Sequence, residues 1–500
     1  MFTFLSKYAI IETINKKEIF MQTQKLNTKR VIFVGFAFFL ISAFWQAYDA
    51  IVPLMLTNRF GLPQTASGAI MALDNVFALF MLPLFGSLSD KSNSKYGKRT
   101  PFIFLGTICA IVSFIALTLI DNFQLAKLSD EIKAMYPVGV EDVTAKNEAL
   151  KAVAKKTLEI TIDNPLPLIF FILALLVVLI SMATFRSPAV ALMPDVTVKP
   201  LRSKANAIIN LMGTAGGILV LILGMVFNTS GAENVYMKYT GYIIAVCVVM
   251  AIGLAIFIFT VKEKQWNSEM LATQAILDEN APVEETVSEN EEKLPKDKLI
   301  SLLLILASVA LWFTGYNAVT TKYSLYATNI LEQNFNLTLI IAQAAAIVSY
   351  IPVGVVASKF GRKKTILAGV LMLAVAFGGA IFITSSTTPI VMYLLFALAG
   401  VAWATINVNS FPMVVELAKG SNIGKYTGFY YTASMSAQVI TPILSGFLMD
   451  VINMRVLFPY ATIFVMLSFV TMFFVKHGNA QDLAGKSAKD LISDNFSNDD

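Results

Sequence analysis

Apolar residues collect into twelve long stretches that shorter polar segments separate. Each stretch has about the roughly 20 residues that an α-helix needs to cross a bilayer. Strands of a membrane barrel would be shorter, with apolar and polar residues alternating, and backbone groups in lipid must be paired within their own segment. The pattern therefore predicts an all-α membrane protein with twelve spans, at residues 31–56, 65–89, 101–120, 166–192, 203–227, 236–260, 299–322, 338–358, 365–385, 389–412, 423–449 and 456–475.

Basic residues are unequally shared between the two sets of short loops. One set carries Lys91, Lys95, Lys98, Arg99, Lys199, Arg202, Lys204, Lys359, Arg362, Lys363, Lys364, Lys419 and Lys425, whereas the other carries Arg59, Lys238, Lys322 and Arg455. Because basic loops tend to stay in the cytosol, the first set is predicted to be cytosolic. Residues 1–30 and 477–500 are then cytosolic tails of a multi-pass protein of the plasma membrane.

Two segments are longer than the other loops. Residues 121–165 lie on the outer side, and their apolar positions predict a short amphipathic helix that lies on the membrane or caps the entrance; a solvated insertion is the equal alternative. Residues 261–298 carry eight acids and no base between Glu269 and Glu292. Such a composition predicts a flexible cytosolic linker between a six-helix half at 31–260 and another at 299–476.

Composition narrows the function classes. Charged residues make up 14% of the chain, against about 25% in a soluble domain, and mean hydropathy is +0.68. Cys109 and Cys247 both lie in apolar stretches, and the only histidine is His477. We therefore expect neither a disulfide, a histidine-based metal site nor a cofactor. The net charge of +5 is modest, so no nucleic-acid partner is expected, and no hydrolase or nucleotide-binding motif points to an enzyme.

The two halves share a loop motif. After the second stretch the chain reads Gly86-x-x-x-Asp90-Lys91 and then Gly97-Lys98-Arg99; after the eighth it reads Gly354-x-x-x-Ser358-Lys359-Phe360-Gly361-Arg362. This repeat, with twelve spans and a polar centre, resembles the major facilitator superfamily, which implies a transporter built of two six-helix halves. Ser358 stands where the motif has an acid, so a salt-bridge latch is expected in the first half alone.

A narrower resemblance concerns two further loops. Ser89-Asp90-Lys91 through Thr100-Pro101-Phe102-Ile103, and Ala191-Leu192-Met193-Pro194-Asp195 with Arg202-Ser203-Lys204-Ala205-Asn206, are similar to loops of sucrose/proton symporters and of the glycoside–pentoside–hexuronide:cation symporters. This resemblance implies cation-coupled uptake of a glycoside, of disaccharide or small-oligosaccharide size. A proton-coupled efflux antiporter for amphiphilic compounds is the alternative, which the absence of a Gly-Pro pair near Gly216 disfavours.

Carboxylates inside a span are costly unless they meet water or a partner. Asp49 on the first stretch and Asp74 on the second fall at similar depth in the outer half, by a helical rise of about 1.5 Å per residue. Since neighbouring carboxylates repel, one would keep a proton or both would share a cation. Asp49 and Asp74 are therefore the predicted coupling site for H⁺ or Na⁺, against a purely structural role for either.

Uncharged polar and aromatic side chains in the spans suit a sugar, because amides pair with hydroxyls and aromatic faces pack on C–H groups. Arg186 is the one arginine well inside a span. It could be a sugar ligand, a counter-charge for an acid or a structural gate residue. Gly315, among polar residues, predicts a broken seventh span. The predicted substrate-binding residues are Trp45, Gln46, Tyr48, Asn75, Arg186, Tyr316, Asn317, Gln343, Trp403, Asn407 and Gln438.

A last group lies at the cytosolic ends of the spans. Acids and bases there can pair and so favour one conformation without touching substrate. The predicted cytosolic gate consists of Gly86, Asp90, Gly97, Arg99, Asp195, Arg202 and Glu416.

Overall fold

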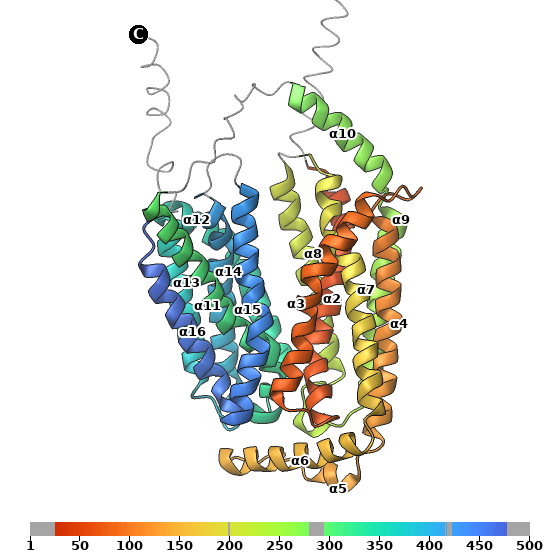
Figure 1. Ribbon diagram of the computed structural model, residues 1–500, viewed down its shortest axis with the longest axis vertical. Helices are drawn as coiled ribbons and strands as arrows, with labels where there is room; N and C mark the ends of the chain where they lie inside the picture. Colours follow the sequence, from red (N-terminus) through yellow and green to blue (C-terminus); the bar gives the residue numbers. More distant parts are fainter. Residues whose placement is uncertain (1–25, 199–200, 280–294, 416, 418–422, 478–500) are drawn as a thin grey trace, which may run out of the picture.

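The protein is a bundle of long helices, seen in a computed structural model that describes residues 26–198, 201–279, 295–415, 417 and 423–477 (Figure 1). The first half consists of α2 (Thr28–Asn58), α3 (Gln64–Asp90), α4 (Thr100–Leu125), α7 (Leu166–Asp195), α8 (Arg202–Val226) and α9 (Thr240–Thr260). The second half consists of α11 (Lys296–Tyr326), α12 (Phe335–Phe360), α13 (Arg362–Ala380), α14 (Pro389–Val415), α15 (Ile423–Val451) and α16 (Leu457–Phe473).

These helices match the predicted spans. Among the described residues, eleven helices are long and apolar enough to cross a membrane, and the apolar part of α12, Phe335–Tyr350, supplies the twelfth stretch. The all-α membrane fold is thus confirmed. Glu416 and most of both predicted tails lie outside the described residues.

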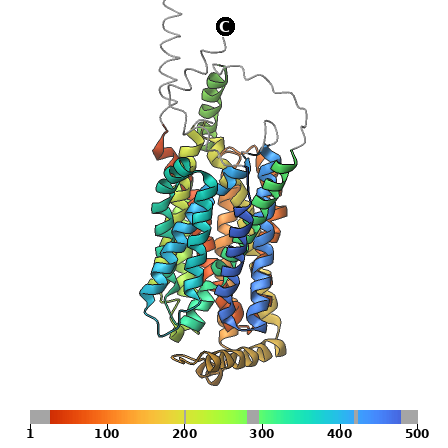
Figure 2. The same cartoon turned by 90° about the vertical axis from the view of Figure 1, so that its left-hand side faces the viewer.

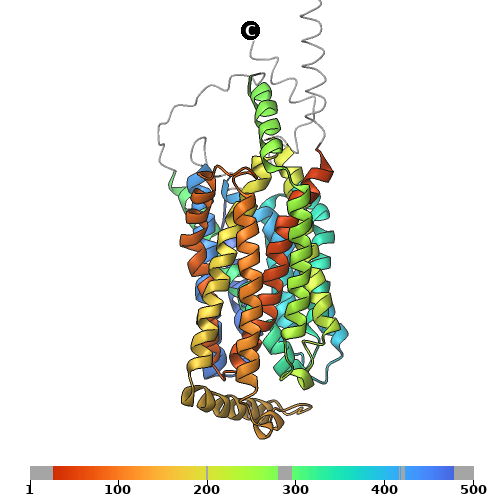
Figure 3. The ribbon, with the colours of Figure 1, turned by 90° about the vertical axis from the view of Figure 1, so that its right-hand side faces the viewer.

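The two halves repeat one packing scheme. In the first half α2 packs on α8 and α9, and α4 packs on α7; in the second half α11 packs on α15 and α16, and α13 packs on α14. Contacts between the halves follow the same repeat, with α3 against α15 and α12 against α8. Figure 2 faces the second half and Figure 3 the first. Equivalent helices therefore occupy equivalent places in each half.

The segment after α9 corrects the prediction of a flexible linker over its first part. Glu263–Glu279 forms helix α10, at one end of the bundle (Figure 3). The Glu263 carboxylate accepts hydrogen bonds from the backbone N–H groups of Lys98, Arg99 and Thr100 at 2.6–3.1 Å, and Trp266 is buried. The prediction was wrong for Glu263–Glu279 because it rested on the acids from Glu269 onward and did not consider Glu263, which caps the start of α4.

At the opposite end, the insertion after α4 forms two helices, α5 (Asp130–Ala134) and α6 (Val143–Asp163). Side views show α6 lying across the end of the bundle (Figures 2 and 3). The side chain of Asp142 caps α6 by accepting from the N–H of Ala145 at 2.7 Å. The insertion thus contains the predicted helix, while its role as a cap of an entrance or as a membrane-surface helix stays a prediction. The two ends of the bundle are called the α6 side and the α10 side below.

The predicted break in the seventh span is also wrong. α11 continues through Gly315 and Lys322 to Tyr326, followed by a π-helical turn, Ala327–Leu331. A Cβ at Gly315 would lie 2.7 Å from the Ala461 carbonyl oxygen of α16. The Thr314 hydroxyl bonds to the Ala310 carbonyl of its own helix at 2.8 Å. Gly315 therefore permits the close approach of α11 and α16. The polar Thr314 beside it bonds to a backbone carbonyl of α11 and does not interrupt the helix.

The halves touch most closely on the α6 side. A Cβ at Gly68 of α3 would lie 1.9 Å from the Pro442 carbonyl oxygen of α15, and one at Gly446 would lie 2.2 Å from the Gln64 carbonyl oxygen. Only residues without a side chain permit backbones to approach so closely. In Figure 1 the halves converge toward α6 and lie further apart near α10. The molecule is therefore closed on the α6 side.

Two charged residues of the second half hold this closure. Pro63 precedes α3 and offers no capping side chain. Instead, the Asp450 carboxylate of α15 accepts from the N–H groups of Gln64 and Thr65, each at 2.7 Å. The fully buried Lys322 of α11 donates to the Gln64 carbonyl oxygen at 3.0 Å. We call Gln64, Thr65, Lys322 and Asp450 the outer clamp.

A second buried charge lies within the first half. Arg59, which follows α2, and Asp121 of α4 are both fully buried, with Nε and Oδ1 3.4 Å apart, and Arg59 also donates to the Val235 and Met237 carbonyl oxygens. The sequence analysis assigns Arg59 and Lys322 to short loops. Both are fully buried, so of the short loops on the α6 side only Lys238 and Arg455 remain in that count.

Asp121→Asn should destabilise the protein by about 3–5 kcal/mol, because it leaves the Arg59 charge buried without its counter-charge. A fall in the melting temperature of the detergent-purified protein would measure this effect. Asp130→Asn is the matched control, since Asp130 pairs with Lys133 on an exposed surface. An Asp121→Asn protein that melts with the wild type would contradict the assignment.

Asp450→Asn should open the α6 side. Removing a charged partner from such hydrogen bonds is worth about 1.5–3 kcal/mol, a population shift of about tenfold or more. The reporter is maleimide labelling of Ser67→Cys, a fully buried position of α3, in protein without Cys109 and Cys247. Labelling should accelerate in the Asp450→Asn protein and stay unchanged with Asp163→Asn, at the exposed end of α6; equal rates in all three would exclude the clamp.

Candidate functional site

The predicted coupling acids lie in one cluster of the first half. Asp49 of α2 and Asp74 of α3 are partly exposed and close enough for their charges to interact. The Asp74 carboxylate accepts from the backbone N–H and the side-chain amide of Asn75, at 2.6 and 2.7 Å. Within the described part of the chain, no hydrogen bond reaches the Asp49 carboxylate. Asp49 is therefore the acid that is left for a ligand.

Arg186 of α7 joins this cluster. Its guanidinium lies 5.8 Å from the centre of the Trp45 ring, and its charge interacts with that of Asp74. Of its three alternative roles, this placement favours that of counter-charge. One arginine beside two carboxylates leaves an excess of one negative charge when all three are ionised. A proton or a monovalent cation at Asp49 would neutralise the cluster.

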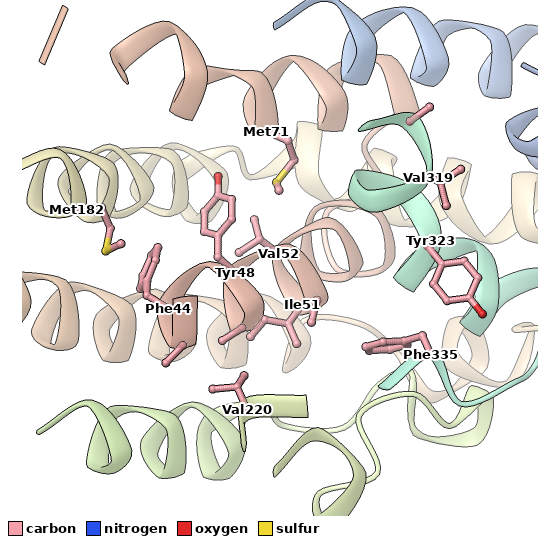
Figure 4. Packing of buried hydrophobic residues seen from close by; sticks show 14 of the residues in the cluster. Phe44, Tyr48, Ile51, Val52, Met71, Met182, Val220, Val319, Tyr323 and Phe335 are labelled. Atoms are coloured by element: carbon pink, nitrogen blue, oxygen red, sulfur yellow. The ribbon is translucent and has the colours of Figure 1, made fainter. Parts of the chain in front are cut away.

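Tyr48 lies beside the acids. Figure 4 shows its ring pointing from α2 toward Met71 of α3. The side chain is fully buried, and among the described residues neither its hydroxyl nor the indole N–H of Trp45 has a hydrogen-bond partner. Buried donors are rarely left unpaired in proteins. These two groups are thus available to a bound molecule or to water.

A pair of amides joins the halves at the centre of the bundle. The Gln343 Nε2 of α12 donates to the Gln46 Oε1 of α2 at 2.7 Å. Gly217 of α8 adjoins both, since a Cβ there would lie 3.4 Å from Gln343 and 3.6 Å from Gln46. A ligand bound between the halves would have to compete with this hydrogen bond.

The second half contributes an aromatic surface. Tyr316 of α11 stacks on Trp403 of α14, with ring centres 3.7 Å apart and planes 5° from parallel. Asn317 follows on α11, and its buried Nδ2 has no partner among the described residues. Asn407, one turn beyond Trp403, is hydrogen-bonded to Tyr350. Four predicted sugar-binding residues therefore lie on adjoining turns of two helices.

One predicted ligand stands apart from this group. Gln438 of α15 donates to the Ser434 carbonyl oxygen of its own helix at 3.3 Å. Bonding to the backbone one turn away is an ordinary way to satisfy an amide in a helix. The structure gives Gln438 no link to the aromatic surface, and its role stays a prediction.

Most of the predicted gate residues form a cluster around Arg99 on the α10 side. Its guanidinium donates to Asp195 at 2.7 Å and pairs with Asp90 and Ser89, while the Gly86 carbonyl oxygen lies 3.4 Å away. These residues lie on α3 and α7 and, in the case of Arg99, directly before α4. In this conformation the cluster joins helices of the first half, and a role in closing the α10 side stays a prediction.

The other gate residues lie around this cluster. Gly97 has φ +118°, and a Cβ there would lie 2.3 Å from the Glu263 side chain, so glycine is required both for the turn and for α10. Arg202 donates to the Pro194 and Thr197 carbonyl oxygens at 3.0 and 3.1 Å. It thus caps the end of α7 rather than joining Asp195. Glu416 lies outside the described residues.

Sequence reasoning missed the residues that close the α6 side. Lys322 was taken for a loop base, and Asp450 and Gln64 were not singled out. Two signals were available: a lysine four residues before the end of one helix and an acid at the end of another. Neither indicates which residue it bonds to. Tyr350, the hydrogen-bond partner of Asn407, was missed because nothing near it in the sequence indicates that partner.

Comparisons with known proteins give the family. Residues 300–496 match the model of the Major Facilitator Superfamily, and residues 33–133 match the model described as MFS/sugar transport protein. An uncharacterized MFS-type transporter of Methanocaldococcus jannaschii is 23% identical over 458 residues, covering 90% of this chain and 95% of the relative.

Solved structures share the fold. A D-xylose-proton symporter matches with a TM-score of 0.59 and 16% identity, over 90% of this chain and 98% of its own. A bacterial homologue of the iron transporter ferroportin, in an inward-facing state, has the same TM-score at 12% identity, over 90% and 99%. Such different cargoes on one fold show that the fold does not fix the substrate. With two matching family models and this twelve-helix architecture, the chain belongs to the major facilitator superfamily, and it is a multi-pass membrane transporter rather than an enzyme.

Proposed function

We propose that the protein imports a sugar or glycoside, of disaccharide or small-oligosaccharide size, together with H⁺ or Na⁺. The observation that carries the proposal is the excess carboxylate at Asp49, beside the Asp74–Arg186 pair and within the same bundle as the Tyr316–Trp403 stack. An acid without a fixed partner inside a span is a site for a cation. A stacked aromatic surface with amides beside it suits a sugar ring.

The comparisons support the same cargo class. The family model that matches residues 33–133 describes sugar transport proteins, and one structure of similar fold is a D-xylose-proton symporter. The loops at Asp90–Arg99 and Asp195–Arg202 resemble those of glycoside:cation symporters. We assign the α10 side to the cytosol, from the basic loops that lie there, and the protein to the plasma membrane.

Transport then proceeds by alternating access. The outer clamp closes the α6 side in the conformation described here, and in the proposed cycle this is the state that exchanges cargo with the cytosol. To load from outside, the α3–α15 contact must separate while the α10 side closes. Symport requires that cation and sugar together favour the reorientation that neither favours alone. The proposed cation site at Asp49 would share its helix turns with the proposed sugar contacts Trp45 and Gln46.

Asp49→Asn should abolish uphill uptake but leave sugar counterflow, because an amide keeps the shape of the side chain yet cannot bind a proton or balance Na⁺. Asp74→Asn should do the same and, in addition, lower the melting temperature, since it leaves Arg186 without its counter-charge. Proteoliposomes supplied with a panel of radiolabelled sugars would measure both activities, with and without H⁺ and Na⁺ gradients.

Asp163→Asn, on the exposed end of α6, is the matched control and should transport as the wild type does. If both the Asp49→Asn and Asp74→Asn proteins concentrate sugar against a gradient, the coupling site lies elsewhere. If no sugar in the panel is exchanged by the wild type, the cargo class itself is wrong.

A further inference from the structure

A cavity of about 370 Å³ lies beneath α6, at the end of the bundle. This volume falls within the range of small-molecule sites. Its walls come from the ends of α2 and α3, from α6 and Tyr136, and from Asn329 and the end of α15 in the second half. Both halves and the insertion therefore contribute to the wall of the cavity.

The outer clamp forms its floor. Gln64 and Asp450 line the cavity and are hydrogen-bonded to each other through the backbone of α3. Asp74 lies ten residues further along α3, about 15 Å deeper at the helical rise. The cavity is thus on the outer side of the closed clamp, and it is distinct from the central cluster around Asp49.

The insertion is fixed over the cavity from both halves. Gly61 of the first half has φ +66°, and a Cβ there would lie 2.5 Å from backbone atoms of Ala154 and Leu158, so α6 rests directly on it. On the other side, Lys146 of α6 pairs with Glu332, and the Tyr136 hydroxyl donates to Asn329 at 2.7 Å. Burial raises the pKa of Tyr136 well above its ordinary value, so this hydroxyl keeps its proton.

Two polar groups in the wall have no partner among the described residues. They are the Asn58 amide nitrogen and the Thr157 hydroxyl, on side chains that are 8% and 1% exposed. Leaving a buried amide or hydroxyl unpaired is costly. Apolar side chains, among them Leu62, Val153 and Met449, line the cavity beside them. Lys151, Lys155 and Asp450 also line the cavity. Hydrogen-bonding groups, with charges of both signs, next to apolar surface suit a small polar molecule with hydroxyls and C–H faces.

We propose that this cavity is a second binding site, for a neutral sugar of monosaccharide size or for one unit of a longer glycoside. The proposal rests on the proposed function for its choice of sugar over other polyols. Because both halves and α6 form the wall, a sugar bound there favours the conformation that is closed on the α6 side. External sugar at high concentration then slows its own uptake, since it delays the return of the empty central site to the outside.

The test is protection of a cysteine at the mouth of the cavity. Lys151→Cys, an exposed cavity-lining position on α6, is labelled with a maleimide in nanodiscs, with D-xylose, D-glucose or sucrose present, in protein without Cys109 and Cys247. At least one sugar should slow the labelling of Lys151→Cys. The same sugar should leave Lys156→Cys, on the exposed face of α6, unaffected.

Adding Thr157→Val or Asn58→Leu should raise the sugar concentration needed for protection by about tenfold, as expected for the loss of hydrogen bonds to a ligand. Thr144→Val, on the exposed face of α6, is the matched control and should change nothing. Proteoliposomes with Thr157→Val should also lose the inhibition of uptake by concentrated external sugar.

Absence of protection by a sugar that the same protein exchanges would overturn the second site and leave the proposed function intact. Protection that Thr157→Val and Asn58→Leu both leave unchanged would overturn it as well, because the signal would then come from a conformational response to the central site. Protection without any sugar exchange would support the cavity and contradict the proposed transport.

Discussion

Each charged or polar group that is buried in this bundle, away from water, needs a hydrogen-bonding partner. The conformation depends on whether that partner belongs to the same half or to the other half. Asp450 and Lys322, both of the second half, are satisfied by backbone and side-chain groups of the first half at the start of α3. The start of α3 therefore needs the second half to satisfy its backbone groups, and the buried charges of Lys322 and Asp450 need the first half. The contact between the halves therefore also caps α3. Separating the halves on the α6 side would remove this cap.

The two ends of the molecule use this constraint differently. On the α6 side the charged hydrogen bonds run between the halves, and the α6 helix adds the Lys146–Glu332 pair. On the α10 side the Arg99 cluster and Glu263 satisfy one another within the first half and α10. In the proposed transport cycle the first kind of contact breaks when the α6 side opens, whereas the second, which lies within the first half and α10, can stay intact. Between them lies Asp49, the carboxylate that has no protein partner within the described residues.

The order of the spans and the internal repeat could be predicted from sequence, because apolar length and loop charge are local properties of the chain. The Asp49–Asp74 cluster could be proposed for the same reason, since helical rise puts both at one depth. Partners across the halves could not be predicted, because nothing in the sequence around Lys322 indicates that it bonds to Gln64, 258 residues earlier in the chain. The break predicted at Gly315 was wrong for the same reason. Its close contact with α16 cannot be predicted from the residues around it in the sequence.

The central claim is that this conformation is one of two that exchange during transport. Spin labels placed across the α10-side ends of α7 and α14, and a second pair across the α6-side ends of α3 and α15, measure both ends of the bundle in nanodiscs. Adding a transported sugar with its cation should lengthen one distance distribution and shorten the other in the same sample. If both distributions stay fixed under saturating sugar and cation, the halves do not alternate and the account is wrong.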